Sequence, residues 1–244
     1  MIPGSIIAHG NYIKNCEKHC SCMYKTNNGL SAAFFDLDLT ITNRDSFRSF
    51  LSWLYLGLWR NWMHVPSVLL FGTLRKIKII SLQKFKEKSL VTLYGKEKDL
   101  IEKIGKIFFD EHLKKNIRKR ALEKVNFHKD KGDLVFILSA SPDIYLHPIA
   151  QYLECEDYRC SELAYENNKF IGKFKGKDCL GDEKVKKVKV IKEKYGIDLS
   201  VSFAYSDHES DLPLLEIMGN PVAFTPTNKL RKLAVEKRWV VEEW

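Results

Sequence analysis

The chain has 244 residues, of which 45% are apolar and 29% are charged, and its formal charge is +9. This length allows one substantial core with an inserted subdomain, and the composition excludes wholesale disorder. The charge is concentrated in residues 44–131, which carry 21 Lys and Arg against 9 Asp and Glu, a net of +12. Such a basic segment is typical of a protein that meets an anionic small molecule, an anionic membrane surface or nucleic acid, although a solvated helical surface gives the same pattern.

Residues 1–30 are predicted to be an N-terminal extension outside the folded core, without stable structure of their own. They contain Cys16, His19, Cys20 and Cys22, which could be metal ligands. Their spacing, however, lacks the two well-separated ligand pairs of a structural zinc site. No cleavable signal is evident, and six cysteines without a paired framework favour a reducing cytoplasm as the location.

The first predicted strand is a short apolar run, residues 32–35, which stops abruptly at acidic residues. Residues 46–125 then show helical patterning. Within them, residues 47–71 are rich in Trp, Leu and Tyr, yet Arg48 and Arg60 interrupt the segment. The uncharged stretch between these arginines, 49–59, has 11 residues, and a spanning helix needs about 20. A packed aromatic helix is the plain interpretation. The alternative is an interfacial helix on anionic lipid, peripheral to the inner face of the membrane.

The rest of the chain alternates between strands and helices. The sequence predicts a strand at 134–138, a hairpin at 162–174 that turns at 166–169, a helix at 184–195 ended by Gly196, and strands at 201–205 and 221–224. This alternation is typical of an α/β fold with a mostly parallel, Rossmann-like sheet. We therefore predict a core made of residues 31–45 and 126–244, with residues 46–125 inserted as an α-helical cap.

Acidic and hydroxylic side chains follow three of the predicted strands. In open parallel sheets, ligands bind beyond the carboxyl ends of the strands, so these side chains are candidates for one site. They are Asp36, Asp38 and Thr40 after the first strand, Ser139 after the second, and Asp207 and Asp211 after the third, with Lys184 at the start of the preceding helix.

This set suits hydrolysis of a phosphate ester by a carboxylate. Attack of a carboxylate on a phosphate meets charge repulsion, so a cation is needed, and Mg²⁺ prefers hard oxygen ligands such as those of Asp36 and Asp207. Asp38 lies two residues after Asp36, on the same side of an extended chain, and can act as acid and base. Ser139 and Lys184 can hold and neutralise phosphate oxygens.

Each residue also has a plainer interpretation. The two aspartates could cap a helix, Ser139 could be a helix N-cap only, and Lys184 lies among many lysines whose usual place is the solvated surface. The sequence has no G-x-x-x-x-G-K-[ST] loop, so nucleotide-kinase chemistry is unsupported.

Four motifs resemble those of the haloacid dehalogenase (HAD) superfamily, subfamily IB, in which phosphoserine phosphatases are the familiar members. The motifs are Phe-Phe-Asp36-Leu-Asp38-Leu-Thr40, Ile-Leu-Ser139-Ala-Ser, Cys-Leu-Gly-Asp-Glu-Lys184 and Tyr-Ser-Asp207-His-Glu-Ser-Asp211. They occur in this order, and the resemblance covers residues 31–241. It implies the HAD core fold with a C1-type helical cap.

The resemblance also implies a role for each residue. Asp36 would be the nucleophile and Asp38 the acid and base, while Asp36, the Asp38 carbonyl and Asp207 would hold Mg²⁺. Phosphate would be bound by Ser139, the Ala140 amide and Lys184. Asp211 would support Lys184 and the metal, and Asp45 matches an acidic residue that contacts substrate. Leu39 departs from the pattern, which usually has a small residue there, so the phosphate loop is expected to be more crowded.

The predicted function is Mg²⁺-dependent hydrolysis of a phosphomonoester through an aspartyl-phosphate, with a small metabolite such as phosphoserine as substrate. The aromatic start of the cap and the fourth motif are similar to a bacterial branch that includes phosphatidylglycerophosphate phosphatases. A lipid-phosphate phosphatase at the membrane surface is therefore the alternative. A nucleic-acid binder ranks last, because pure binding does not need the acidic set, and no nucleic-acid partner is expected.

Overall fold

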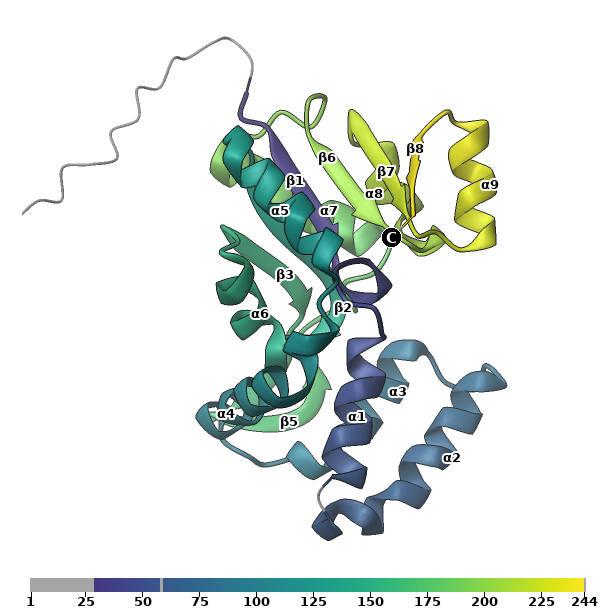
Figure 1. The fold of residues 1–244 in the computed structure, drawn as a ribbon. Helices are drawn as coiled ribbons and strands as arrows, with labels where there is room; N and C mark the ends of the chain where they lie inside the picture. The colour runs from purple at the N-terminus through teal and green to yellow at the C-terminus, as the bar shows by residue number, and fades with distance from the viewer. Residues whose placement is uncertain (1–28, 58, 244) are drawn as a thin grey trace, which may run out of the picture.

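A sheet of six parallel strands forms the centre of the protein (Figure 1). The computed structural model describes residues 29–57 and 59–243. The strand order is β3-β2-β1-β6-β7-β8, with β1 (Ala32–Asp36), β2 (Leu134–Pro142), β3 (Asp157–Ser161), β6 (Phe203–Ser206), β7 (Asn220–Phe224) and β8 (Val240–Glu242). The predicted parallel α/β fold is confirmed. The candidate ligands Cys16, His19, Cys20 and Cys22 lie outside the described residues.

Both faces of the sheet are covered by helices. Successive residues of a strand point to opposite faces, and in β1 the residues Ala33 and Phe35 pack in the core that contains α5 (Lys119–Lys131) and α6 (Leu146–Leu153). Ala32 and Phe34 pack in a second core with α7 (Asp182–Tyr195), α8 (Leu212–Glu216) and α9 (Asn228–Glu236). Burial on both sides explains why the central strands are continuous apolar runs.

The predicted elements are present, with shifted ends. Strand β2 continues to Pro142, so Ser139 lies within it, and its pairing with β3 becomes irregular between Leu138 and Pro142. Strand β6 begins at Phe203, two residues later than expected, because the chain turns just before it, where the Ser202 amide donates to the Leu199 carbonyl at 3.3 Å. Strands β3 and β8 were not predicted.

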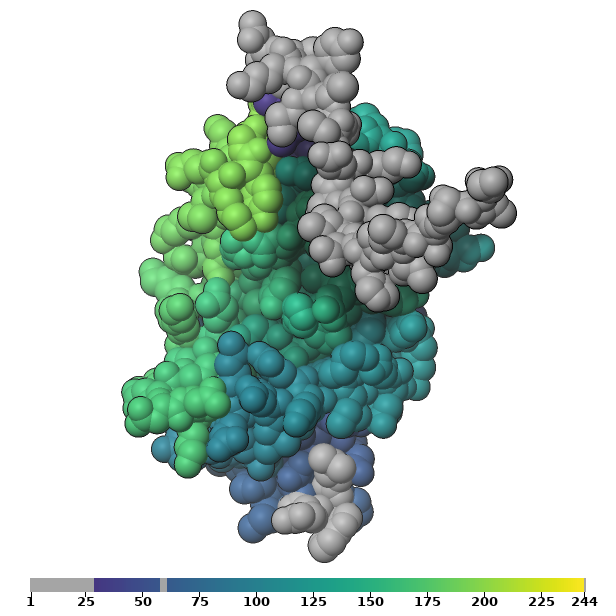
Figure 2. Space-filling view, turned by 90° about the vertical axis from the view of Figure 1, so that its left-hand side faces the viewer, coloured from purple at the N-terminus to yellow at the C-terminus, as the bar shows by residue number. Residues whose placement is uncertain are grey.

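The hairpin is confirmed and lies against the cap. Its strands are β4 (Leu163–Glu166) and β5 (Lys169–Phe174), joined by Asn167 and Asn168 with φ of 48° and 63°, a left-handed conformation that asparagine tolerates. The amides of Gly95 and Lys98 donate to the carbonyls of Phe170 and Asn168 at 2.8 and 3.0 Å. In the space-filling view, the green surface of the hairpin lies beside the blue-teal surface of the inserted segment (Figure 2). This hairpin, although late in the chain, therefore packs against the inserted segment and is hydrogen-bonded to it.

The inserted segment is helical, as predicted. It contains α1 (Ser46–Leu56), α2 (Val65–Lys76), α3 (Leu82–Ser89) and α4 (Lys98–Phe108), with 3-10 segments at Trp59–His64, Val91–Leu93 and Lys114–Asn116 and a π-type turn at Phe109–Leu113. Phe50 of α1 packs on Phe108 and on Tyr145 of the core, with ring centroids 5.1 and 5.5 Å apart. In the described part of the chain, no helix is long and apolar enough to cross a bilayer.

Helix α5 lies on the sheet rather than in the cap. It packs against β1 and β2, and the His128 ring bonds Tyr205 of β6 through Nε2 at 2.7 Å. The division at residues 125 and 126 remains a prediction. We propose instead that the cap ends at Arg118, before α5 begins.

Candidate active site

Two carboxylates and one lysine meet beyond the ends of β1 and β6. The Lys184 ammonium donates to Asp36 Oδ1 at 2.5 Å and to Asp211 Oδ2 at 2.6 Å, and Ser206 Oγ donates to the same Asp211 oxygen at 2.8 Å. The Lys184 side chain is only 1% exposed, whereas Lys186, Lys189, Lys192 and Lys194 of the same helix are exposed. Lys184 thus differs from the neighbouring lysines in the sequence because it is buried.

The formal charge of this cluster is negative, because four carboxyl groups surround one lysine. Burial raises the pKa of Asp36 well above its usual value, Lys184 opposes the rise, and Asp211, Asp207 and Asp38 add to it. Burial also raises the pKa of Asp207 to about 6. For Lys184, burial disfavours the charged form, but Asp211 and Asp36 outweigh that effect and raise the pKa of its ammonium. One lysine does not balance four carboxylates, so the site favours a further cation.

Asp38 has separate surroundings on the cap side. Its Oδ1 accepts from the Ser46 amide at 2.5 Å and its Oδ2 accepts from Ser141 Oγ at 2.6 Å. The Ser46 hydroxyl bonds Ser141 Oγ at 2.9 Å and Tyr145 Oη at 3.2 Å. Burial, with Asp45 nearby, raises the pKa of Asp38 against the opposing hydrogen bonds of Ser141 and Ser46. A carboxyl with a raised pKa suits general acid–base work.

A tight turn joins the two aspartates to the cap. Residues Leu37–Ile41 form a π-type turn closed by the Thr42 amide on the Leu37 carbonyl at 2.9 Å. Leu39 has φ 61° and ψ −3°, a strained conformation for a residue with a branched side chain. Its side chain is 42% exposed, so it points outward from the turn. Thr40 Oγ1 is buried and finds no hydrogen-bond partner among the described residues.

Ser139 is fully buried, and its orientation suits donation to a ligand. Its Oγ accepts from the Ser141 amide at 3.0 Å, which leaves the hydroxyl hydrogen available to a phosphate oxygen. The next carbonyl, that of Ala140, accepts from Lys86 Nζ at 2.6 Å and from Ser161 Oγ at 3.0 Å. The segment predicted to bind phosphate is therefore fixed on both sides.

The residues present fit a magnesium ion by their donor chemistry. Asp36 and Asp207 are both buried carboxylates, one the last residue of β1 and the other directly after the adjacent strand β6. Asp211 Oδ1 is a buried oxygen with no partner in the described part of the chain. Across residues 29–57 and 59–243, no three His, Cys, Asp or Glu side chains form a ready metal cluster. The predicted ligand set does not require one, because it combines two carboxylates with the Asp38 carbonyl.

Asp45 lies near Asp38, and its charge helps to raise the pKa of Asp38. Its carboxylate caps α1 by accepting from the Arg48 amide at 2.8 Å, and it pairs with the Arg48 guanidinium at 3.5 Å. It lines an open groove of about 1480 Å³ together with Leu39, Arg48 and Trp53. Capping accounts for its position, and contact with substrate remains a prediction.

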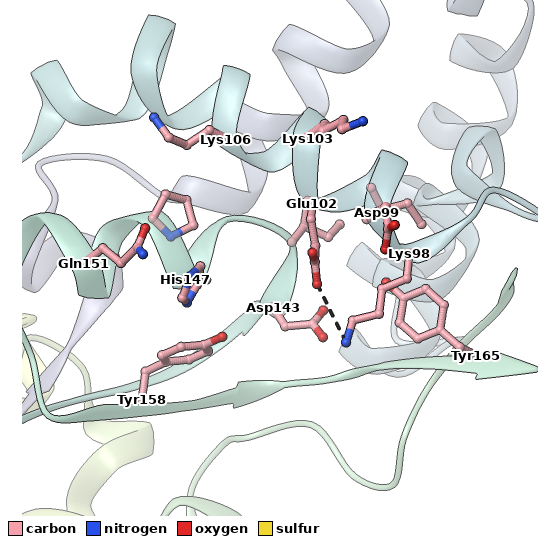
Figure 3. Close-up of a pocket in the computed structure, with 13 residues that line it drawn as sticks. Lys98, Asp99, Glu102, Lys103, Lys106, Asp143, His147, Gln151, Tyr158 and Tyr165 are labelled. Carbon is pink, nitrogen blue, oxygen red and sulfur yellow. Dashed lines mark ion pairs between the residues drawn. The ribbon is translucent and has the colours of Figure 1, made fainter. Parts of the chain in front are cut away.

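A second cavity lies between the cap helix α4, helix α6 and the hairpin (Figure 3). Its volume is about 590 Å³, and its lining includes Asp143, Glu102 and His147 but none of the predicted site residues. Burial raises the pKa of Asp143 there to about 6. This cavity is distinct from the carboxylate cluster.

Sequence reasoning did not single out Ser46, Ser141, Tyr145 or Lys86. Ser141 had a signal, since it lies two residues after Ser139 in the same motif. Ser46 follows Asp45 directly at the predicted start of the cap. Tyr145 and Lys86 carried no local signal, because they reach the site only through packing.

The whole chain can now be placed in a family. Residues 33–216, which include every predicted site residue, match the model of the haloacid dehalogenase-like hydrolases. The chain belongs to this family and is a hydrolase.

Several known proteins are similar to this one. It is 26% identical over 218 residues to phosphoserine phosphatase SerB1 of Mycobacterium tuberculosis, covering 88% of this chain and 71% of that protein. A solved protein of unknown function from Bordetella pertussis superposes with a TM-score of 0.78 at 22% identity, covering 88% and 98% of the two chains. A phosphoserine phosphatase described as a phospho-aspartyl intermediate analogue gives 0.60 at 19% identity, covering 84% and 91%. These structural likenesses show the shared fold.

Proposed function

We propose that this hydrolase is a Mg²⁺-dependent phosphomonoester hydrolase that works through an aspartyl-phosphate, with a small metabolite such as phosphoserine as substrate. The observation that carries the proposal is the different setting of two carboxylates two residues apart. Asp36 is paired with the buried Lys184, and Asp38 is held by donors from the cap and from β2. Such a pair suits one nucleophile and one acid–base group.

In the proposed reaction, an Asp36 oxygen attacks phosphorus and the ester P–O bond breaks. The leaving oxygen takes a proton from Asp38. Asp38 then accepts a proton from a water molecule that attacks the acyl-phosphate, which releases phosphate and restores Asp36. Lys184 and Ser139 stabilise the phosphate oxygens throughout.

We propose that Asp36, Asp207 and the Asp38 carbonyl hold Mg²⁺, and that Asp211 keeps Lys184 in place. The cation would neutralise charge between the phosphate and the attacking carboxylate. The support for this is the excess of carboxylates around one lysine and the unpartnered Asp211 oxygen.

A phosphate-release assay tests the proposal, with phosphoserine, phosphatidylglycerophosphate and an aryl phosphate as substrates, with and without Mg²⁺. We expect Mg²⁺-dependent release that Asp36→Asn abolishes and that Asp38→Asn lowers by about 10²- to 10⁴-fold. A folded, Mg²⁺-loaded wild type that hydrolyses none of the three would contradict the proposal.

A lipid phosphate is the second candidate substrate, and the surface of the cap favours it. Trp62, Met63, Leu69, Leu70, Ile77 and Ile79 are all exposed on or beside α2. Residues 46–86 include seven Lys and Arg and no acidic residue. Apolar side chains among basic ones suit an anionic membrane surface.

Sedimentation with anionic and neutral vesicles separates the two candidates. A lipid-phosphate phosphatase should bind anionic vesicles at low salt and release phosphate from phosphatidylglycerophosphate. Turnover of phosphoserine without any vesicle binding would leave the small metabolite as the substrate class.

A further inference from the structure

One face of the cap helix α3 is joined to the core by polar contacts. Gln83, Lys86 and Glu87 are spaced so that they share this face. Gln83 Nε2 donates to the Gly176 carbonyl at 2.9 Å, and Gln83 Oε1 accepts from the Asp178 amide at 3.2 Å. The contacts fall on the segment that leads from the hairpin to α7, the helix that carries Lys184.

Lys86 is at the centre of this face and is almost completely buried. Its side chain is 6% exposed, and its ammonium lies 2.8 and 3.1 Å from the two carboxylate oxygens of Asp178. The same ammonium donates to the Ala140 carbonyl at 2.6 Å. A buried lysine is costly unless its hydrogens find acceptors, and here they do.

One acceptor, Ala140, lies in a segment proposed to bind phosphate, and the other, Asp178, directly precedes the motif that ends at Lys184. The peptide between Ala140 and Ser141 is held at its carbonyl by Lys86 and at its amide by Ser139 Oγ. Asp178 lies six residues before Lys184, and the single hydroxyl hydrogen of Ser161 is within reach of both Asp178 Oδ1 and the Ala140 carbonyl. Lys86, a residue of the cap, therefore contacts both segments at once.

We infer that Lys86 is a positioning residue for the phosphate site. It fixes the Ala140–Ser141 peptide, and with it the direction in which Ser139 presents its hydroxyl hydrogen, only while the cap is docked on the core. This inference rests on the proposed phosphatase function. The plainer role for the same pair is stabilisation alone, and the experiment separates the two.

The test compares Lys86→Met with the double variant Lys86→Met/Asp178→Asn. The single change leaves the Asp178 carboxylate buried without its partner, so Tm should fall by roughly 10 °C. The double change removes that unpaired charge, and Tm should recover. We expect kcat/KM of the double variant to stay about 100-fold below wild type, because the Ala140 carbonyl still lacks its ammonium donor. Lys84→Met, an exposed lysine on the same helix, is the control and should match wild type.

Recovery of both Tm and kcat/KM in the double variant would overturn the inference. If the double variant does not fold, the single variant Lys86→Met decides when it is assayed well below its own Tm: wild-type kcat/KM in that folded variant, which has no ammonium donor for the Ala140 carbonyl, would also overturn the inference.

Calorimetric measurement of inorganic phosphate binding in the presence of Mg²⁺ distinguishes failure of this inference from failure of the proposed function. A wild type that turns over none of the esters but binds phosphate refutes only the substrate proposal. The inference then requires that the double variant lose phosphate binding. A wild type that does neither removes both proposals.

Discussion

Helices α2 and α3 are neighbours in the same basic part of the cap, yet their side chains have different surroundings. Helix α3 buries Lys86 and Ser89, and its polar face contacts the segments around the candidate site. Helix α2 buries no residue and exposes Leu69 and Leu70. The basic residues of the cap therefore do not form one continuous surface. Lys86 is buried against the core, whereas α2 faces outward with exposed apolar side chains.

The largest expected change in stability follows from replacing Lys184, which, like Lys86, is buried and paired with carboxylates. Lys184→Met leaves Asp36 and Asp211 buried without their cation, so the free energy of unfolding should fall by about 3–5 kcal/mol. Urea denaturation measures it. Lys186→Met removes an exposed lysine from the same helix and should change it by less than about 0.5 kcal/mol. Equal effects of the two changes would remove the distinction between internal and external lysines.

A pH-dependent effect is expected at Asp143, beside the cap helix α4. The pKa of this buried carboxyl is raised to about 6, so the folded state holds its proton to higher pH than the unfolded chain does. Its contribution to stability is complete below about pH 4 and is lost as the pH rises through 6. Asp143→Asn should therefore be more stable than wild type at pH 7, by up to about 3 kcal/mol, and by much less at pH 4.

Urea titrations at several pH values measure this difference. Asp99→Asn, an exposed carboxyl that lines the same cavity, is the matched control and should show no such trend. A wild type and an Asp143→Asn variant that differ by a constant amount from pH 4 to pH 7 would contradict the prediction.

The smallest expected effect on the fold is on the outward helix. The double variant Leu69→Ser/Leu70→Ser removes side chains that are 66% and 56% exposed, so the free energy of unfolding and hydrolysis of a soluble ester should change little. Binding to anionic vesicles should weaken if this face docks on a membrane. A large loss of stability would show that α2 is packed in solution, against a second copy of the chain or another protein.

The central strands could be predicted from the sequence, whereas the edge strands β3 and β8 could not. Strand β1 lies between β2 and β6 with both faces covered, so its short apolar run is unbroken and easy to recognise. Strands β3 and β8 each have one neighbour in the sheet. Their residues, such as Asp157 and Arg159 in β3, are partly exposed and lack a periodic apolar pattern.

The motif residues of the candidate site could be predicted for a similar reason. Asp36 and Asp38 mark the end of a buried strand, and Asp207 and Asp211 follow another. The partners of Asp38 could not be predicted in the same way, because Ser141 is 103 residues away in the chain. Lys86 is 54 residues from Ala140, and only the docking of the cap on the core brings them together.

The central claim is that Asp36 forms the acyl-phosphate, and chemical trapping tests it most directly. The protein is mixed with Mg²⁺ and a turned-over phosphate ester, quenched in acid, treated with borohydride and digested for mass spectrometry. Reduction of an aspartyl-phosphate gives homoserine, which we predict at position 36 and not at position 38. Homoserine elsewhere, or full phosphate release with an unmodified Asp36 peptide at every quench time, would contradict the account.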